Sequence, residues 1–199
     1  MARKSPSLKR KVGTREYRKI CWVSTEGQTE KDYFGMDVFK NTPSGMRVRF
    51  PKDIHGSRRN PEAVMKRFQK VMRNHDFHKG DEAWLMVDVD DWSAKEFDSL
   101  IRWMRSDSRY HLAISNPKFE LFLLMHFEKG NGCTTSENID KALYRHMPSY
   151  SKRLGTKQFS IGEIKTAIEN AETKRACCKD EIPSPGMTDA HCLARRLLR

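Results

Sequence analysis

The stretch Ala83-Trp84-Leu85-Met86-Val87-Asp88-Val89-Asp90-Asp91 decides the fold. It begins with five apolar residues in a row, and a short uninterrupted apolar run is typical of a strand buried on both faces of a parallel sheet. The run ends in Asp88 and Asp90, which share one face if the strand continues, because side chains alternate along a strand. A second short apolar stretch, Ile20–Val23, leads to Glu26 in the same way. The sequence therefore predicts an α/β protein with acidic side chains at strand ends.

Predicted strands and helices alternate on both sides of this stretch. Two more strands are expected at Met46–Phe50 and Tyr110–Ile114. Helices are expected after each strand, and these run from Thr29 to about Phe39, from Asn60 through Met72, from Ser93 through Met104 and from Asn116 to Phe127. This alternation favours a doubly wound, parallel four-stranded sheet flanked by helices, with the strand order 2-1-3-4.

The chain is expected to divide into three parts. Residues 1–17 form a basic N-terminal arm, residues 18–130 form the α/β core, and residues 131–199 form a helical extension that packs on the core. Within the extension, Ser136 and Ser160 are the expected N-caps of two helices. Thr188–Leu198 is expected to be a closing amphipathic helix. No residue pattern in the extension points to a particular chemistry.

The charge of the chain indicates its class of partner. The 199 residues carry a formal net charge of +12, and a positive field of this size attracts polyanions, so nucleic acid is the expected partner. Part of the charge is concentrated in the arm and in an Arg-Arg pair after the second strand. The residues expected to bind nucleic acid are Lys9, Arg10, Lys11, Arg15, Arg58 and Arg59. A solvated basic surface is the simpler alternative.

Other features of the sequence exclude several classes of protein. No apolar run approaches the roughly 20 residues needed to cross a bilayer, and no apolar segment follows the basic N-terminus, so we expect a cytoplasmic protein without a membrane partner. The five cysteines form no C-x-x-C pair, which favours reduced thiols over a zinc site or a disulfide framework. The chain has no G-x-x-x-x-G-K-[ST] loop, so any ATPase activity would come from a partner.

Acidic residues follow three of the predicted strands. Glu26 and Glu30 follow the first strand, Asp88 and Asp90 end the third, and Glu120 lies beyond the fourth. In an open α/β sheet, ligands bind at the carboxyl ends of the strands, where the strand order reverses. Clustered carboxylates repel one another, and a hard cation such as Mg²⁺ or Mn²⁺ relieves that repulsion. We expect these residues to be metal ligands; ordinary first-turn helix acids are the simpler alternative for Glu30 and Glu120.

Three blocks of sequence carry a family resemblance. They are ICWVSTEGQTEKDYF at 20–34, WLMVDVDD at 84–91 and SNPKFELFLLMHF at 115–127, with a weaker block, MTDAHCL, at 187–193. A strand that ends in Glu-Gly, followed by a strand that ends in Asp-x-Asp, is similar to the Toprim domain of topoisomerases, primases and the overcoming-lysogenization-defect nucleases. Together the blocks resemble the RloB family more narrowly. The resemblance implies a Toprim-like fold, which is a Rossmann-like arrangement.

The resemblance also implies different roles for the acidic residues. As in the Toprim nucleases, Glu26 is the implied general acid/base, and Asp88 and Asp90 are the implied metal ligands, with Glu30 and Glu120 as further ligands. The resemblance further implies a bacterial protein encoded near an ATPase of the ABC/AAA type, in anti-phage or abortive-infection systems. Such an ATPase is therefore an expected partner.

Lys118, in the Asn-Pro-Lys-Phe-Glu block, is a further catalytic candidate. From its position we expect it to offset the charge that builds up on a phosphoryl group under attack, and a solvated lysine is the simpler alternative.

The sequence as a whole predicts a Mg²⁺-dependent nuclease that acts on RNA, with tRNA as one candidate, or on DNA. A non-catalytic subunit that binds nucleic acid or nucleotide and docks on an ATPase is the main alternative. A phospho-acceptor receiver domain is a weaker one, because its paired acids would follow the first strand. The oligomeric state is open, with a homo-oligomer as one outcome.

Overall fold

The computed structural model describes residues 18–40, 42–51, 61–73, 77–89 and 94–199. The elements of these residues, in chain order, are β1 (Ile20–Ser24), α1 (Gln28–Phe34), the 3-10 helix η1 (Asp37–Phe39), β2 (Arg47–Arg49), α2 (Pro61–Arg73), β3 (Glu82–Asp88), α3 (Ala94–Arg105), β4 (Tyr110–Asn116), α4 (Glu120–Leu124), α5 (Ser136–His146), α6 (Ile161–Arg175), β5 (Met187–Thr188) and α7 (Ala190–Leu198).

The strands of the described residues form one five-stranded sheet in the order β2-β1-β3-β4-β5. β1 pairs in parallel with both β2 and β3, and β3 pairs in parallel with β4, whereas β5 runs antiparallel to β4. The predicted α/β class and the order of the first four strands are confirmed, and the fold is broadly Rossmann-like. The predicted number of four strands is wrong.

The unpredicted strand, β5, lies at the predicted start of the closing helix. Its residues Met187 and Thr188 pair with Asn116 and Ser115, and the hydroxyl oxygens of Ser115 and Thr188 are 2.8 Å apart. The closing helix α7 begins at Ala190 instead. A strand of two residues is too short to show alternation of apolar and polar side chains, so no sequence pattern marked it.

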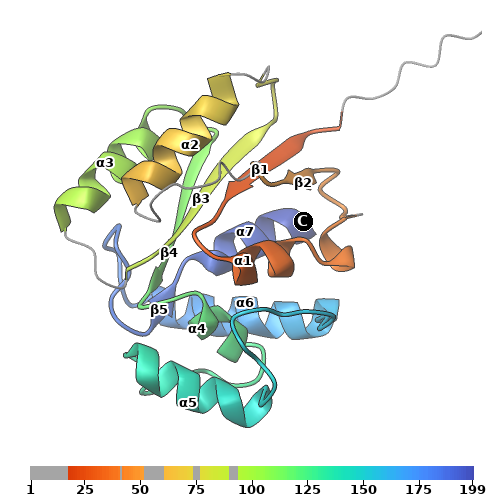
Figure 1. Ribbon diagram of the computed structural model, residues 1–199, viewed down its shortest axis with the longest axis vertical. Coiled ribbons are helices and arrows are strands. Elements are labelled where there is room, and N and C mark those ends of the chain that lie inside the picture. Colours follow the sequence, from red (N-terminus) through yellow and green to blue (C-terminus); the bar gives the residue numbers. More distant parts are fainter. Residues whose placement is uncertain (1–17, 41, 52–60, 74–76, 90–93) are drawn as a thin grey trace, which may run out of the picture.

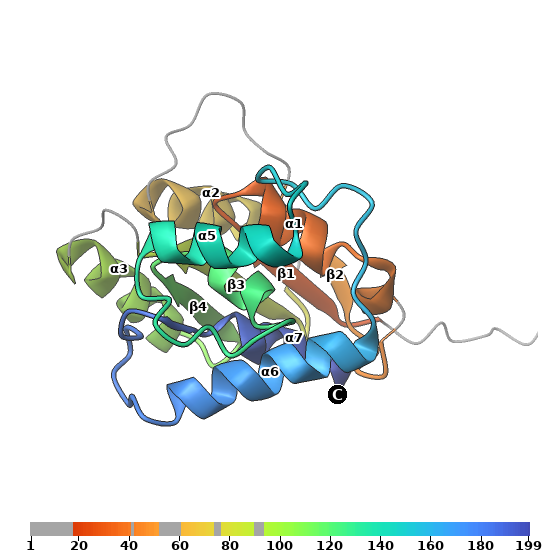
Figure 2. The same cartoon turned by 90° about the horizontal axis from the view of Figure 1, so that it is seen from below.

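Helices cover both faces of the sheet, as Figures 1 and 2 show. α2 and α3 cover one face, where Phe68 and Phe97 join Trp22, Leu85 and Ile114 in one apolar cluster. These strand residues lie on the same face because side chains alternate along each strand.

The other face is covered by α1, α4, α6 and α7. Here Val23 and Met86 of the sheet belong to the same apolar cluster as Ile139, Ile164 and Leu193, which lie beyond residue 130. α6 packs on β5 and α7 packs on β4, so the C-terminal helices complete the cover of this face. Among the described helices, none has both the length and the apolar character that a membrane span requires.

The predicted helix starts agree with the structure in part. α6 begins with the predicted capping box, in which Ser160 Oγ accepts from the Glu163 N–H (3.2 Å) and Glu163 Oε2 accepts from the Ser160 N–H (2.7 Å). The prediction of Thr29 as an N-cap is wrong, because the N-cap of α1 is Gly27. The helix predicted to reach Phe39 ends at Phe34, and η1 follows it.

Two further helix boundaries differ from the prediction. The N-cap of α5 is Thr135 rather than Ser136, because the Thr135 side chain accepts from the Asn138 N–H. The helix predicted from Asn116 is regular only over Glu120–Leu124, since Asn116 still belongs to β4.

Candidate functional site

The carboxyl ends of β1, β3 and β4 lie at one edge of the sheet, and this edge holds the described candidate acids. β1 and β3 are parallel neighbours, with Ser24 paired to Leu85, and Asp88 at the end of β3 pairs with Ser115 of β4. Glu26 lies two residues beyond the end of β1. Both Glu26 and Asp88 are half-buried. The topology therefore places these carboxylates at the edge where an α/β sheet binds its ligands.

Glu30 is buried in the first turn of α1, behind this edge. Its Oε1 accepts a hydrogen bond from the Gly27 N–H (3.1 Å), which holds the loop after β1 against the helix. Burial raises the pKa of Glu30 above its ordinary value, and the negative charge of Glu120 raises it further. The two buried carboxylates are therefore close enough to influence each other's charge.

Glu120, also buried, begins α4 and is held by residues from the segment after α5. Its Oε1 accepts from the Tyr150 hydroxyl at 2.8 Å and from the Lys152 ammonium at 3.1 Å. The hydroxyl oxygens of Tyr150 and Thr29 are 2.9 Å apart. Burial raises the pKa of Tyr150, and the charge of Glu120 raises it further. Tyr150 therefore stays protonated and donates to Glu120.

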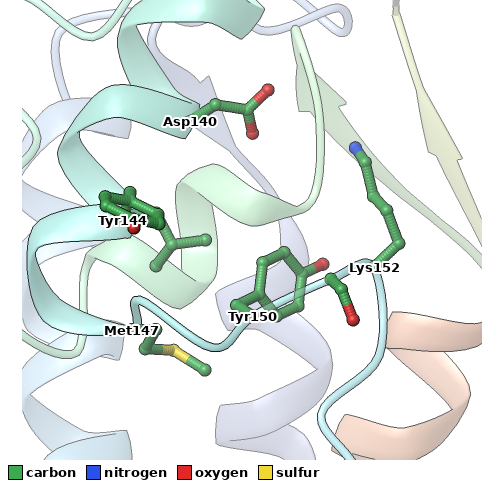
Figure 3. A pocket seen from close by; sticks show the side chains of 7 residues that line it. Asp140, Tyr144, Met147, Tyr150 and Lys152 are labelled. Carbon is green, nitrogen blue, oxygen red and sulfur yellow. The ribbon is translucent and has the colours of Figure 1, made fainter.

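Lys152 reaches Glu120 from an unusual backbone conformation. Its φ of 62° lies in the left-handed region, which residues other than glycine adopt at a cost and which is frequent at functional sites. The backbone carbonyl of Lys152 accepts from the Thr29 hydroxyl at 3.0 Å, while its ammonium pairs with Glu120. Figure 3 shows Tyr150 and Lys152 on the segment that follows α5. This conformation thus ties the segment to both α1 and α4.

Lys118, the predicted catalytic lysine, is buried, and its side chain is only 5% exposed. Its ammonium pairs with Asp140 of α5, with Nζ and Oδ1 2.7 Å apart. The alternative of a solvated lysine therefore does not fit the structure. Lys118 and Lys152 bring two ammonium groups to the start of α4 and its surroundings.

No sequence pattern predicted a role for Tyr150, Lys152 or Asp140. Tyr150 and Lys152 lie in an irregular segment without periodicity, and Asp140 lies on the exposed side of α5. A tyrosine and a lysine two residues apart are common in loops, so no sequence signal distinguishes them. Only the packing of this segment on α1 and α4 reveals their relation to Glu120.

The donor atoms at this edge suit a hard cation, because carboxylate oxygens are the ligands that Mg²⁺ and Mn²⁺ prefer. Glu26 and Asp88 are the described carboxylates best placed to share such an ion. Within the described ranges, no three His, Cys, Asp or Glu side chains form a group that could hold a metal. The predicted partner Asp90 lies outside those ranges, between residues 89 and 94. Glu120 Oε1 is already paired with a cation of the chain itself, Lys152.

The predicted nucleic-acid-binding residues Lys9, Arg10, Lys11, Arg15, Arg58 and Arg59 also lie outside the described residues, as do the predicted helix starts Asn60 and Ser93. Two other basic residues, Arg47 and Arg49, are exposed on β2 at the edge of the sheet. They add positive charge to the described surface.

The fold and the site define a class: a mostly parallel, Rossmann-like α/β protein with acidic side chains at the carboxyl edge of its sheet. The family model described as RloB-like protein matches residues 21–197 of the chain. The chain therefore belongs to the RloB-like family. The searches of curated proteins and of solved structures found no match.

Proposed function

We propose that this RloB-like protein is a Mg²⁺-dependent nuclease of the Toprim type that hydrolyses phosphodiester bonds in RNA or DNA. The observation that carries the proposal is the position of Glu26 and Asp88 at the carboxyl ends of adjacent parallel strands. Asp90, two residues beyond Asp88, would supply the next carboxylate. Such a set of oxygen donors fits a divalent cation that binds a phosphate.

In the proposed mechanism, Glu26 moves the proton of the attacking water. Glu26 is half-buried at the carboxyl edge of the sheet, and a carboxylate within hydrogen-bond reach of a water molecule can accept its proton. Asp88 and Asp90 would hold the cation, which when bound polarises the scissile phosphate and acidifies water.

Glu30 and Glu120 support the site from behind. The Glu30 carboxylate accepts from the Gly27 N–H and so fixes the loop that carries Glu26. Glu120 positions Lys152 and Tyr150. We assign both glutamates chiefly to positioning, with a direct role in holding the cation as the alternative that the sequence suggests.

The two lysines near α4 would interact with the phosphate backbone. Lys152 is exposed over much of its side chain (68%), whereas Lys118 is buried against Asp140. A phosphate that approached the site would meet the ammonium of Lys152 first. The high positive charge of the chain supports the same class of ligand. A role in anti-phage defence and an ATPase partner remain expectations of the family resemblance.

The decisive experiment incubates the purified full-length protein with labelled single-stranded RNA, tRNA, single-stranded DNA and duplex DNA, in Mg²⁺, Mn²⁺ or EDTA. Wild type is compared with Glu26→Ala and with Glu169→Ala, which alters an exposed glutamate on α6. The proposal predicts metal-dependent cleavage that Glu26→Ala abolishes and Glu169→Ala retains.

The contrary result is equally clear. If no substrate is cut in either metal, with or without a co-purified ATPase, and Glu26→Ala keeps the biological activity of wild type, the protein is a binding module and the nuclease proposal is wrong.

A further inference from the structure

A small pocket opens beside the buried Glu120 cluster, between α5 and the segment that follows it (Figure 3). Its volume is about 210 Å³. The side chains that line it are mostly apolar or aromatic, with polar groups from both elements, and they are Asp140, Leu143, Tyr144, Met147, Tyr150, Ser151 and Lys152. Tyr144 is 65% exposed, and only it and Ile161 are exposed large hydrophobic residues in the described part of the chain. The pocket therefore offers an aromatic surface to solvent.

Three of the lining residues connect the pocket to the proposed active site. Tyr150 and Lys152 both contact Glu120 Oε1. Asp140 pairs with Lys118, which lies two residues before Glu120 in the chain. A group bound in the pocket would therefore lie next to the positively charged side of the site.

The size and chemistry of the pocket restrict its ligand. Pockets that enclose a whole small-molecule ligand measure roughly 300–1,000 Å³, so about 210 Å³ suits one planar ring system better than a complete cofactor. Aromatic side chains stack on nucleobases irrespective of their identity, and Tyr144 and Tyr150 provide such rings. Asp140 and Ser151 offer hydrogen-bonding groups at the rim, and Lys152 offers a cation for the adjoining phosphate.

We propose that this pocket binds an unpaired nucleobase, so that the protein selects single-stranded nucleic acid over duplex. A base inside a duplex is stacked and paired, and it cannot enter a pocket without being extruded at a cost of a few kcal/mol. The exposed Arg153 follows Lys152 directly and adds positive charge that a bound nucleic-acid strand could contact. The proposal rests on the proposed nuclease function for its place beside the site, and it names the substrate class of that site.

Binding measured without cleavage tests the pocket independently of catalysis. The full-length protein is titrated in EDTA against a fluorescent single-stranded oligonucleotide, and against the blunt duplex of the same sequence, with anisotropy as the readout. The variants are Tyr144→Ala, Tyr144→Phe, which keeps a ring, and Ile161→Ala, the matched loss of an exposed apolar side chain on α6. Because Tyr144 is exposed, its substitution should leave the fold intact, which circular dichroism verifies.

We expect Tyr144→Ala to weaken single-strand binding about 5- to 100-fold, as the loss of one stacked base predicts. Tyr144→Phe and Ile161→Ala should bind like wild type, and duplex binding should not change in any variant. Photo-cross-linking with an oligonucleotide that contains 5-iodouracil should label the peptide that carries Tyr144 or Tyr150.

Unchanged single-strand affinity in Tyr144→Ala, or an equal loss in Ile161→Ala, would overturn the assignment. A ligand of another class, such as a protein side chain or a free nucleotide, would leave oligonucleotide binding untouched by Tyr144→Ala and would therefore also overturn it. If base binding holds but no metal-dependent cleavage is found, the nuclease proposal fails while the pocket stands. If cleavage is found without single-strand preference, the pocket assignment fails while the nuclease proposal stands.

Discussion

The buried acids at the two edges of the sheet have different hydrogen-bond partners. At the amino edge, Asp81 is fully buried, and its two carboxylate oxygens accept from the backbone N–H groups of Ile20 (2.8 Å) and His78 (3.0 Å). At the carboxyl edge, Glu120 is held by side chains from a distant segment, Tyr150 and Lys152. The first acid binds backbone groups at the amino ends of the strands, whereas the second binds the side chains of two residues from the segment after α5. The two buried acids therefore differ in their partners, which are backbone N–H groups for Asp81 and side chains for Glu120.

The largest expected effect on stability lies at the amino edge. Asp81→Ala would remove the acceptor of two backbone N–H groups and is expected to lower the free energy of unfolding by about 2–4 kcal/mol. Urea unfolding followed by circular dichroism measures the loss. If the amino edge is only structural, the cleavage rate per folded molecule should stay within about 3-fold of wild type. A much larger fall in that rate would show that the amino edge is not only structural.

A second effect concerns His126, which is buried among the rings of Tyr33, Phe122 and Phe159. Its Nδ1 contacts the carbonyl oxygen of Phe122 (3.0 Å), so Nδ1 carries the hydrogen and Nε2 accepts from the Tyr33 hydroxyl (2.9 Å). Burial lowers the pKa of His126 from 6.5 to about 4. The unfolded chain therefore binds a proton before the folded chain does, and stability falls as the pH falls from about 6.5 to about 4.

This pKa difference corresponds to about 3 kcal/mol between neutral pH and pH 4. His126→Gln should therefore lose less stability over that range than wild type. Urea unfolding at both pH values gives the comparison. Identical acid sensitivity of His126→Gln and wild type would contradict the described environment of His126.

The third effect, at Glu30, has the opposite sign. Because burial raises the pKa of Glu30, the folded chain holds this proton more tightly than the unfolded chain, and stability falls as the pH rises above the ordinary value of a glutamate. The difference in free energy of unfolding between Glu30→Gln and wild type should therefore shift in favour of the variant as the pH rises from acid to neutral. The glutamine side chain can still accept from the Gly27 N–H. Unfolding in EDTA at the two pH values measures the difference. A relative loss at neutral pH would show that the ionised carboxylate is stabilised by its partners.

The sequence predicted the parts of this structure that regular patterns encode. The apolar run before Asp88 and the short strand before Glu26 gave two neighbouring parallel strands, and the position of both acids at the carboxyl edge followed from the topology. The capping box at Ser160 was found for the same reason, because its two residues have a definite spacing.

Other parts depended on long-range contacts that leave no local pattern. β5 exists because Met187 and Thr188 pair with the end of β4, and two residues carry no periodicity. The contacts of Tyr150 and Lys152 with Glu120 span 30 and 32 residues of sequence. Their geometry depends on the packing of α5 beside α4, which composition and spacing do not specify.

A metal site at the carboxyl edge is tested most directly by measuring Mn²⁺ binding to the purified protein, with electron paramagnetic resonance as the readout of free ion. We predict a saturable site that is lost in Glu26→Gln and in Asp88→Asn and retained in Asp98→Asn, which alters an exposed aspartate on α3. Saturable binding that neither Glu26→Gln nor Asp88→Asn reduces, or no binding in wild type, would contradict a metal site at the carboxyl edge of the sheet.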